Sequence, residues 1–155
     1  MCHKPQLAVW KKQKHAKAFK TLTSEEAKAV GEKLGLTEPP YKSPECLRCH
    51  ITGWNLDKEQ RAKFLGKRFK VEEGVQCETC HGPGEKYQKL SIMKNRTRAM
   101  ENGLIHPRKK FCLSCHNEKS PSWDPERFTT KDGKKVGFDY DTCWELIKHP
   151  TPEKQ

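Results

Sequence analysis

Six of the eight cysteines stand in three short motifs that could each bind a porphyrin covalently. Each motif has two cysteines separated by two residues and followed at once by a histidine, at residues 46–50, 77–81 and 112–116. At this spacing the two thiols can add to the vinyl groups on one edge of a porphyrin, and the histidine can turn beneath the ring to ligate its iron. The motifs therefore predict three c-type haems (heme c), attached through Cys46, Cys49, Cys77, Cys80, Cys112 and Cys115.

Zinc is the alternative ligand for paired cysteines, because ribbons and knuckles also use this spacing. Histidine is only 7 of the 155 residues, so chance would place one behind all three pairs roughly once in ten thousand sequences. A four-cysteine zinc site does not need those histidines, and three pairs leave half a site over. A thioredoxin-like redox motif is also disfavoured, because no βαβ pattern surrounds the cysteines.

The N-terminus carries what matches the second half of a fourth motif. Cys2 and His3 would complete it if another cysteine stood two residues before Met1. We therefore expect a longer precursor with that cysteine and an export signal, since c-type haems are attached outside the cytoplasmic membrane. This gives four sites, numbered here in chain order from the N-terminus, and a periplasmic or extracellular location. A stray Cys-His pair is the alternative.

The histidines are too few to serve four irons on both faces. Four of them follow cysteines and are expected as proximal ligands: His3, His50, His81 and His116. The other three are candidates for the distal positions: His15, His106 and His149. At least one iron should then lack a distal histidine, unless one comes from a missing segment or another subunit. That iron would be open or would bind a methionine, for which Met93 is the candidate.

Each distal candidate also has a simpler interpretation. His15 could be a surface residue of a lysine-rich helix, and His149 could interact with a helix dipole. His106 precedes Pro107 and could lie on a surface loop, and Met93 could fill a gap in the core.

The polypeptide is too polar to build a large core from its own side chains. Apolar and charged residues each make up 33% of the chain, and the mean hydropathy is −1.01. Typical domains reach about 45–50% apolar residues when glycine is counted. Haem is large and apolar on both faces, so several haems would supply the missing buried surface.

The pattern of capping residues and apolar spacing predicts a mostly α-helical fold. Helices are expected at 5–22, at 23–34 with Gly35 as its stop, at 86–102 with Gly103 as its stop, and at 140–149. Residues 51–76 give a weak pattern that could contain short strands at Phe64, Phe69 and Val71. Residues 82–84 predict a turn and 120–138 a loop. We expect one small domain, 1–155, of helices and long loops wrapped around closely packed haems.

The formal charge of +11 does not by itself indicate nucleic-acid binding. Haem propionates and oxidised iron would leave a four-haem protein at about +7 when oxidised and about +3 when reduced. Such a surface suits an acidic redox partner, although a solvated lysine surface without a partner is equally compatible. No helix-turn-helix or RNA-binding aromatic pattern is present. No run of about 18 apolar residues predicts a transmembrane helix.

Taken together, the motifs resemble the tetrahaem cytochrome c-554 family, whose best-known member accepts electrons from hydroxylamine oxidoreductase. The resemblance covers nearly the whole chain. It rests on five features, which are Cys2-His3-Lys4 with Trp10, the His15-Ala16-Lys17-Ala18 segment, Gly53-Trp54 after the second site, His81-Gly82-Pro83-Gly84, and Ser120-Pro121 before a late helix with His149. A single CxxCH motif is generic, but this combination is much more specific.

The resemblance implies a mostly helical protein with four closely packed haems. Three irons of the family are bis-histidine and the second is five-coordinate, so His50 would be the proximal ligand of an open haem. His15 and His149 match family distal ligands. The chain departs from the family after the third motif, where the family has a distal histidine for the first haem about ten residues on. The first haem must then use His106, Met93, a ligand from another chain, or none.

We therefore predict an exported electron carrier rather than an enzyme, with a donor and an acceptor that the sequence does not identify. Two alternatives belong to other classes. A nitric oxide reductase would use the open haem and would need acid and base groups beside it, which the sequence does not locate. A subunit of an extracellular cytochrome filament would exchange ligands between copies, and would be a homo-oligomer.

Overall fold

The computed structural model of the protein describes residues 3–66 and 69–151. Within these ranges the chain forms short helices joined by long loops, with one ribbon of two strands, so the prediction of a mostly α-helical fold is confirmed. In chain order the elements are α1 (Lys4–Lys12), η1 (His15–Lys17), α2 (Ala18–Thr21), α3 (Glu25–Lys33), α4 (Pro44–His50), α5 (Lys58–Phe64), η2 (Val71–Glu73), α6 (Cys77–His81), η3 (Gly84–Lys86), α7 (Leu90–Met93), α8 (Arg96–Glu101), α9 (Lys109–Cys112), β1 (Phe128–Thr129), β2 (Lys135–Val136) and α10 (Tyr140–Ile147).

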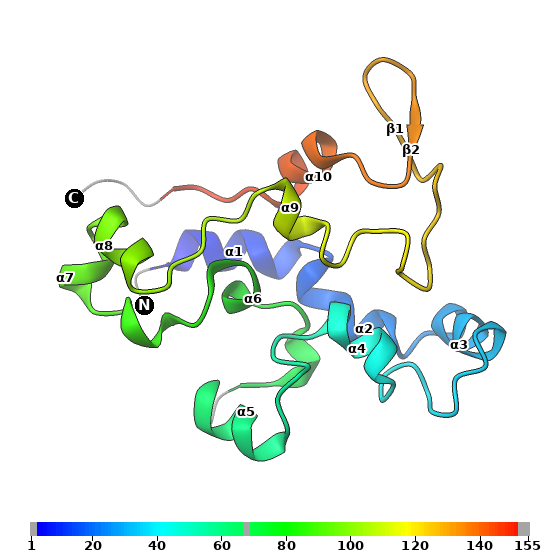
Figure 1. The fold of residues 1–155 in the computed structure, drawn as a ribbon, viewed down its shortest axis with the longest axis horizontal. Helices are drawn as coiled ribbons and strands as arrows, with labels where there is room; N and C mark the ends of the chain where they lie inside the picture. The colour runs from blue at the N-terminus through cyan, green and yellow to red at the C-terminus, as the bar shows by residue number, and fades with distance from the viewer. Residues whose placement is uncertain (1–2, 67–68, 152–155) are drawn as a thin grey trace.

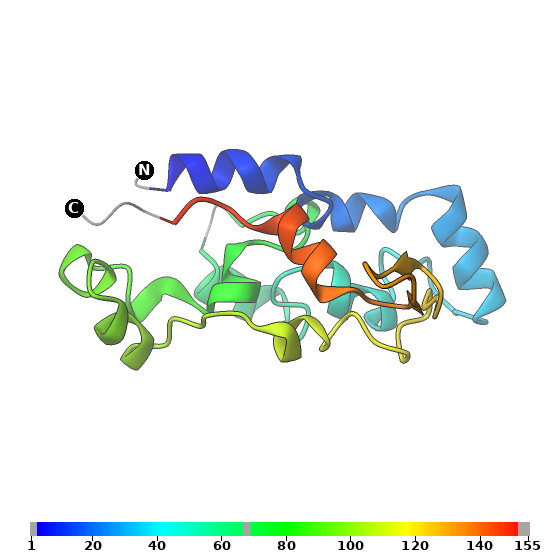
Figure 2. The same ribbon diagram turned by 90° about the horizontal axis from the view of Figure 1, so that it is seen from above.

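The elements spread along one long axis, with α3 at one end and α7 and α8 at the other (Figures 1 and 2). The first helix and the segment that follows α10 run side by side in both views. A hydrogen bond from Gln6 Nε2 to the Pro150 carbonyl, 2.9 Å long, joins them. No helix within 3–66 or 69–151 combines the length and the apolar character needed to cross a bilayer.

The predicted helix at 5–22 is wrong as a single element. It is divided into α1, η1 and α2, because Gln13 has an extended backbone with φ −81° and ψ 158°. The hydrogen bonds of this segment go elsewhere in the fold. The His15 carbonyl accepts the Val75 N–H at 3.0 Å, and the Trp10 indole donates to the Val75 carbonyl at 2.8 Å. These bonds hold the segment against Val75.

A junction formed by His15, Thr52, Gly74, Val75 and Gln76 ties three parts of the chain together. The Thr52 N–H donates to the Gly74 carbonyl at 3.1 Å, and the Gln76 N–H donates to Thr52 Oγ1 at 2.7 Å. Gly74 has a φ of +68°, and a Cβ at this position would stand 2.6 Å from the His15 carbonyl oxygen. Only glycine fits here without a shift of the backbone.

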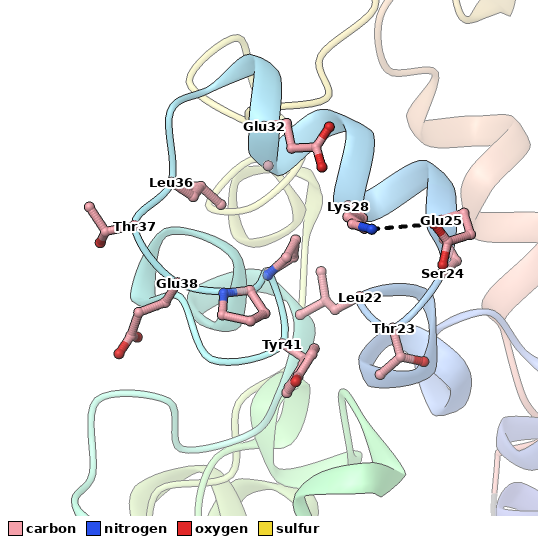
Figure 3. Close-up of a pocket in the computed structure, with 13 residues that line it drawn as sticks. Leu22, Thr23, Ser24, Glu25, Lys28, Glu32, Leu36, Thr37, Glu38 and Tyr41 are labelled. Carbon is pink, nitrogen blue, oxygen red and sulfur yellow. Dashed lines mark ion pairs between the residues drawn. The ribbon is translucent and has the colours of Figure 1, made fainter.

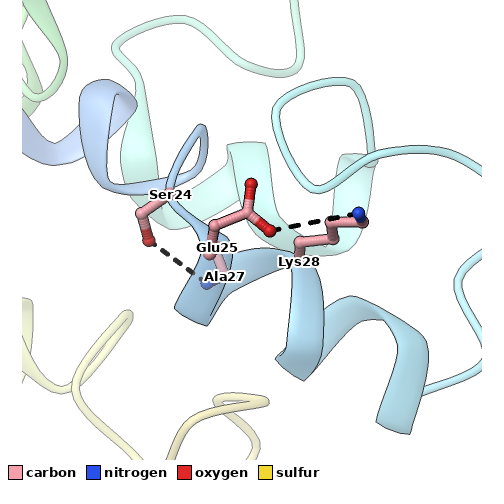
Figure 4. Close-up of polar contacts among 4 residues, drawn as sticks. All are labelled: Ser24, Glu25, Ala27 and Lys28. Atoms are coloured by element: carbon pink, nitrogen blue, oxygen red, sulfur yellow. Dashed lines mark hydrogen bonds and ion pairs between the residues drawn. The ribbon is translucent and has the colours of Figure 1, made fainter.

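Helix α3 confirms the prediction for residues 23–34. Ser24 is its N-cap, and its side chain accepts the Ala27 N–H at 3.2 Å. Figure 4 shows this contact beside the exposed Glu25–Lys28 pair, whose charged atoms are 3.9 Å apart. Gly35 follows the helix with a φ of +66°, which suits a helix stop.

The segment after α3 folds back onto the helix. A Cβ on Gly31 would stand 3.0 Å from Pro40 Cγ, so the proline ring packs directly on the helix backbone. Figure 3 shows the shallow pocket between them, with Leu22 and Tyr41 on one side and the polar side chains of Lys28 and Glu32 on the other. The pocket lies far from α7 and α8, at the opposite end of the long axis.

Two further stretches differ from the predictions. The short strands suggested within 51–76 are wrong, because Phe64 ends α5, Val71 begins η2 and Phe69 lies in no strand. Asp57 begins that helix with a full capping box to Gln60, a signal that the sequence contained. The predicted helix at 86–102 is divided into α7 and α8, because the Asn95 side chain caps the second helix by accepting the Arg98 N–H at 3.0 Å.

The other local predictions need smaller changes. Gly82 and Gly103 have φ values of +75° and +100°, as expected for the turn and the stop. The loop at 120–138 contains the ribbon β1–β2, with Phe128 opposite Val136. Helix α10 ends at Ile147, so His149 lies beyond it rather than inside it.

The core made by side chains is small, as the composition predicts. In the described ranges the buried apolar residues are Leu22, Cys46, Ile51, Val75 and Ala99. Large apolar side chains remain exposed, among them Phe64 at 58% and Leu146 at 62%. The polypeptide therefore has more apolar surface than its own side chains can cover.

Candidate functional site

Short helices present the second and third motifs. Helices α4 and α6 end at His50 and His81, so the two cysteines of each motif lie three positions apart and on one side of a helix turn. Pro44 starts α4, where its missing N–H costs nothing. In the fourth motif, α9 ends at the first cysteine, Cys112. Cys2 of the first motif lies outside the described residues.

His15 and His116 face each other across the fourth site. Their ring centres are 6.0 Å apart and their planes make an angle of 69°. One iron bound by two imidazoles, with bonds of about 2.0–2.1 Å, places the ring centres about 6.4 Å apart. The two rings, 101 positions apart in the chain, thus have nearly the separation of an axial pair.

His81 and His149 form a second pair of the same kind at the third site. Their ring centres are 5.7 Å apart, with an angle of 54°. His81 Nδ1 lies 3.2 Å from the Ile105 carbonyl, and His149 Nδ1 lies 3.2 Å from the Pro150 carbonyl. Each ring can donate its Nδ1–H to a carbonyl, which leaves Nε2 for a metal. Ligating histidines are usually oriented in this way.

Among these histidines, His50 of the second site has the shortest contact between Nδ1 and a backbone carbonyl. Its Nδ1 lies 2.7 Å from the Ala18 carbonyl, where an N–H donor would fix the ring and leave Nε2 free. No second histidine ring pairs with His50 in the part of the chain that the structure describes.

The first site brings His3 to a methionine. His3 Nε2 lies 3.4 Å from Met93 Sδ, at the end of α7. His106 is exposed and follows Ile105, the residue that accepts from His81. The structure thus places Met93, rather than His106, against His3.

The electrostatics favour neutral imidazoles at three of the candidate ligands. Burial lowers the pKa of His15, His81 and His116 below the usual value. The charge of His50 further lowers the pKa of His15. The charges of His15, Arg127 and His50, in that order, further lower the pKa of His116. Neutral imidazole is the form that binds a metal.

The cysteines of the second and fourth sites are in contact. The neighbouring Cys115 thiol raises the pKa of Cys49, and Cys49 lowers that of Cys115. Arg48, inside the second motif, donates to the carbonyl of Lys119, just after the fourth, at 3.2 Å. These contacts place the thioether edges of the two sites side by side.

The third site connects this pair to the first site. Burial, then the thiols of Cys112 and Cys115, raise the pKa of Cys80 to about 11. The pKa of His81 is lowered by burial and then by three neighbouring histidines, of which His3 is one. The third motif therefore lies near the fourth motif and near His3 of the first.

Several residues of the site could not be found from the sequence. Phe138 stacks on the His116 ring, with ring centres 4.9 Å apart and an angle of 13°. The carbonyls of Ala18 and Ile105 orient His50 and His81. Backbone carbonyls have no sequence signal, and Phe138 lies in a loop without a recognisable pattern.

A c-type haem fits the residues that the structure brings together. Each described motif offers thiols beside a histidine, and two sites offer a second histidine at nearly the required separation. The small side-chain core agrees with a fold completed by large apolar groups.

Comparison with known proteins also indicates a c-type cytochrome. The sequence model of the family described as cytochrome c554 and c-prime matches residues 1–82. The chain is 27% identical over 168 aligned positions to cytochrome c-554 of Nitrosomonas europaea, and the alignment covers 95% of this chain and 69% of that relative. No solved structure matches the chain.

Proposed function

The chain belongs to the cytochrome c554 and c-prime family of c-type cytochromes, and from this premise we propose that it is an exported electron carrier with four haems in close contact. The observation that carries this proposal is the pair of facing histidines at each of two sites. Neither pair is local in sequence, and both have nearly the separation that a shared iron requires.

The residues of the chain hold and insulate the redox groups. When bound, c-type haems supply reversible one-electron chemistry. His116 and His15 would ligate the fourth iron, and His81 and His149 the third. His50, held by the Ala18 carbonyl, would ligate the second iron from one side only. An iron bound by two histidines changes its ligand bonds little between oxidation states, and this small change suits an electron carrier.

The order of the sites supports a continuous path through the molecule. The Cys49–Cys115 contact joins the second and fourth sites, and Cys80 lies near the fourth. His3 lies near His81, which brings the first site beside the third. Electrons entering at one end would therefore pass between neighbouring sites without leaving the protein.

The location and the partner follow from the same chemistry. Covalent haem attachment occurs outside the cytoplasmic membrane, so the mature protein would work in the periplasm or beyond. Its net charge with four haems, about +7 when oxidised, suits a redox partner with an acidic surface.

Three histidine variants of the holoprotein, matured from its native gene, test the proposal. His15→Leu and His149→Leu should each convert one low-spin haem to high-spin in the electron paramagnetic resonance spectrum. His106→Leu is the matched control and should leave the spectrum unchanged. Intact mass should fit four haems, and a redox titration should count one electron for each. A wild-type mass without haem, or an unchanged spectrum in His15→Leu, would overturn the proposal.

A further inference from the structure

We infer that His3 and Met93 are the two axial ligands of the first haem, so that one histidine–methionine site stands among the histidine-ligated sites. This inference rests on the proposed function, because it assigns the ligands of one of the four proposed haems. The contact itself carries it: His3 Nε2 and Met93 Sδ are 3.4 Å apart, although the residues are 90 positions apart in the chain.

The distance is close to what a shared iron needs. Metal bonds of about 2.0–2.1 Å to nitrogen and about 2.3 Å to sulfur would separate the two atoms by about 4.4 Å. The observed distance of 3.4 Å is therefore about 1 Å shorter than this separation. Methionine has three rotatable bonds beyond Cα and adapts easily to such a change. His3 is exposed and Met93 is half-buried, so neither side chain is locked by packing.

Both ligands stand on segments that are attached to the third site. Leu7 N–H donates to the His3 carbonyl at 3.0 Å, which holds His3 at the start of α1. That helix is joined to the His149 segment through Gln6 and Pro150. The two segments run side by side in Figures 1 and 2.

Met93 is held from the other side of the third site. Helix α7 is followed directly by α8, which is anchored by the fully buried Ala99. The Leu104 N–H donates to the Ala99 carbonyl, and the Ile105 N–H donates to the His81 carbonyl, each at 2.9 Å. In both views α7 and α8 lie at the same end of the molecule as the start of α1 (Figures 1 and 2).

The competing ligands are directed elsewhere. The Ile105 carbonyl accepts from His81, so the backbone next to His106 is fixed beside the third site. Met100 is another methionine near this site, and its side chain is exposed on α8. Met93 is therefore the ligand that the fold presents to His3.

A thioether ligand changes the redox properties of the haem it binds. Histidine–methionine ligation raises the reduction potential relative to bis-histidine ligation. The first haem should therefore have a higher reduction potential than the third and fourth haems. In an equilibrium titration it would be reduced before those two.

The test uses the holoprotein and three substitutions. Met93→Leu keeps the volume and removes the sulfur, Met93→His restores two histidines, and Met100→Leu is the matched control. The wild type should show the sulfur-to-iron charge-transfer band at the red end of the oxidised spectrum, with the strongly shielded methyl resonance of an axial methionine in the reduced protein. Met100→Leu should retain both signals.

Both Met93 variants should lose the two signals. Met93→Leu should gain one high-spin haem, whereas Met93→His should remain low-spin and should lower the potential of one haem only. A four-haem mass with no charge-transfer band, or a band that persists in Met93→Leu, overturns this inference and leaves the proposed function intact. A mass that fits three haems overturns both the inference and the four-haem count.

Discussion

Replacing Gly74 by alanine should destabilise the protein far more than the same change at another glycine of similar φ. Gly74 has a φ of +68° and a ψ of −135°, a region that costs other residues about 1–3 kcal/mol. The new Cβ would also stand 2.6 Å from the His15 carbonyl oxygen. The backbone must then move and weaken two hydrogen bonds, each worth about 1 kcal/mol.

Together these effects amount to about 3–5 kcal/mol. Gly35 is the matched control, since its φ is +66° and nothing lies within 4 Å of an added Cβ. Gly35→Ala should cost only the backbone penalty, about 1–2 kcal/mol. Guanidinium unfolding of the two holoproteins, followed by circular dichroism, measures both free energies.

The Gly74 variant should also disturb the ligation of the fourth haem, because the clash displaces the residue whose imidazole faces His116. We expect a partial high-spin signal in Gly74→Ala and none in Gly35→Ala. Equal losses of stability in the two variants, with unchanged spectra, would refute the argument from the close approach of Gly74 and His15.

Two further predictions concern the periphery and the fourth site. Ser24→Ala removes the cap of α3 (Figure 4) and should lower the free energy of unfolding by about 1 kcal/mol, while the haem spectra stay unchanged, as optical titration and unfolding curves can check. Phe138→Ala removes the ring stacked on His116, a contact worth about 0.5–1.5 kcal/mol; one low-spin signal should shift in the paramagnetic resonance spectrum, and a spectrum identical to wild type would contradict the role of the stack.

The sequence was sufficient for the features that depend on local chemistry. The CxxCH spacing fixes which residues can attach haem, and the family match confirms that class of cofactor. Ser24 and Gly35 predicted the bounds of α3 because capping is a short-range effect. The capping box of Asp57 and Gln60 is also a short-range signal. The hydrophobic pattern around it was weak, so the helix was not predicted.

What escaped the sequence depends on contacts between distant residues. The helix predicted at 5–22 ends at Lys12 because Gln13 has an extended backbone, and the neighbouring Trp10 and His15 bond to the distant Val75. The helix predicted at 86–102 is divided because Asn95 caps α8, and the hydrophobic pattern did not predict this cap. Likewise, the contact of Met93 with His3 and the stack of Phe138 on His116 exist only in the folded chain.

The two histidine pairs differ in the order in which their members are synthesised. His15 precedes its partner His116, so the fourth site can close as soon as its motif emerges. His81 must wait for His149, which follows α10. In the proposed holoprotein the third iron would therefore stay exposed on one side for longer than the fourth. The segment joined to Gln6 would then be the last to take its place, and its arrival would complete the ligation of the third site in the proposed electron path.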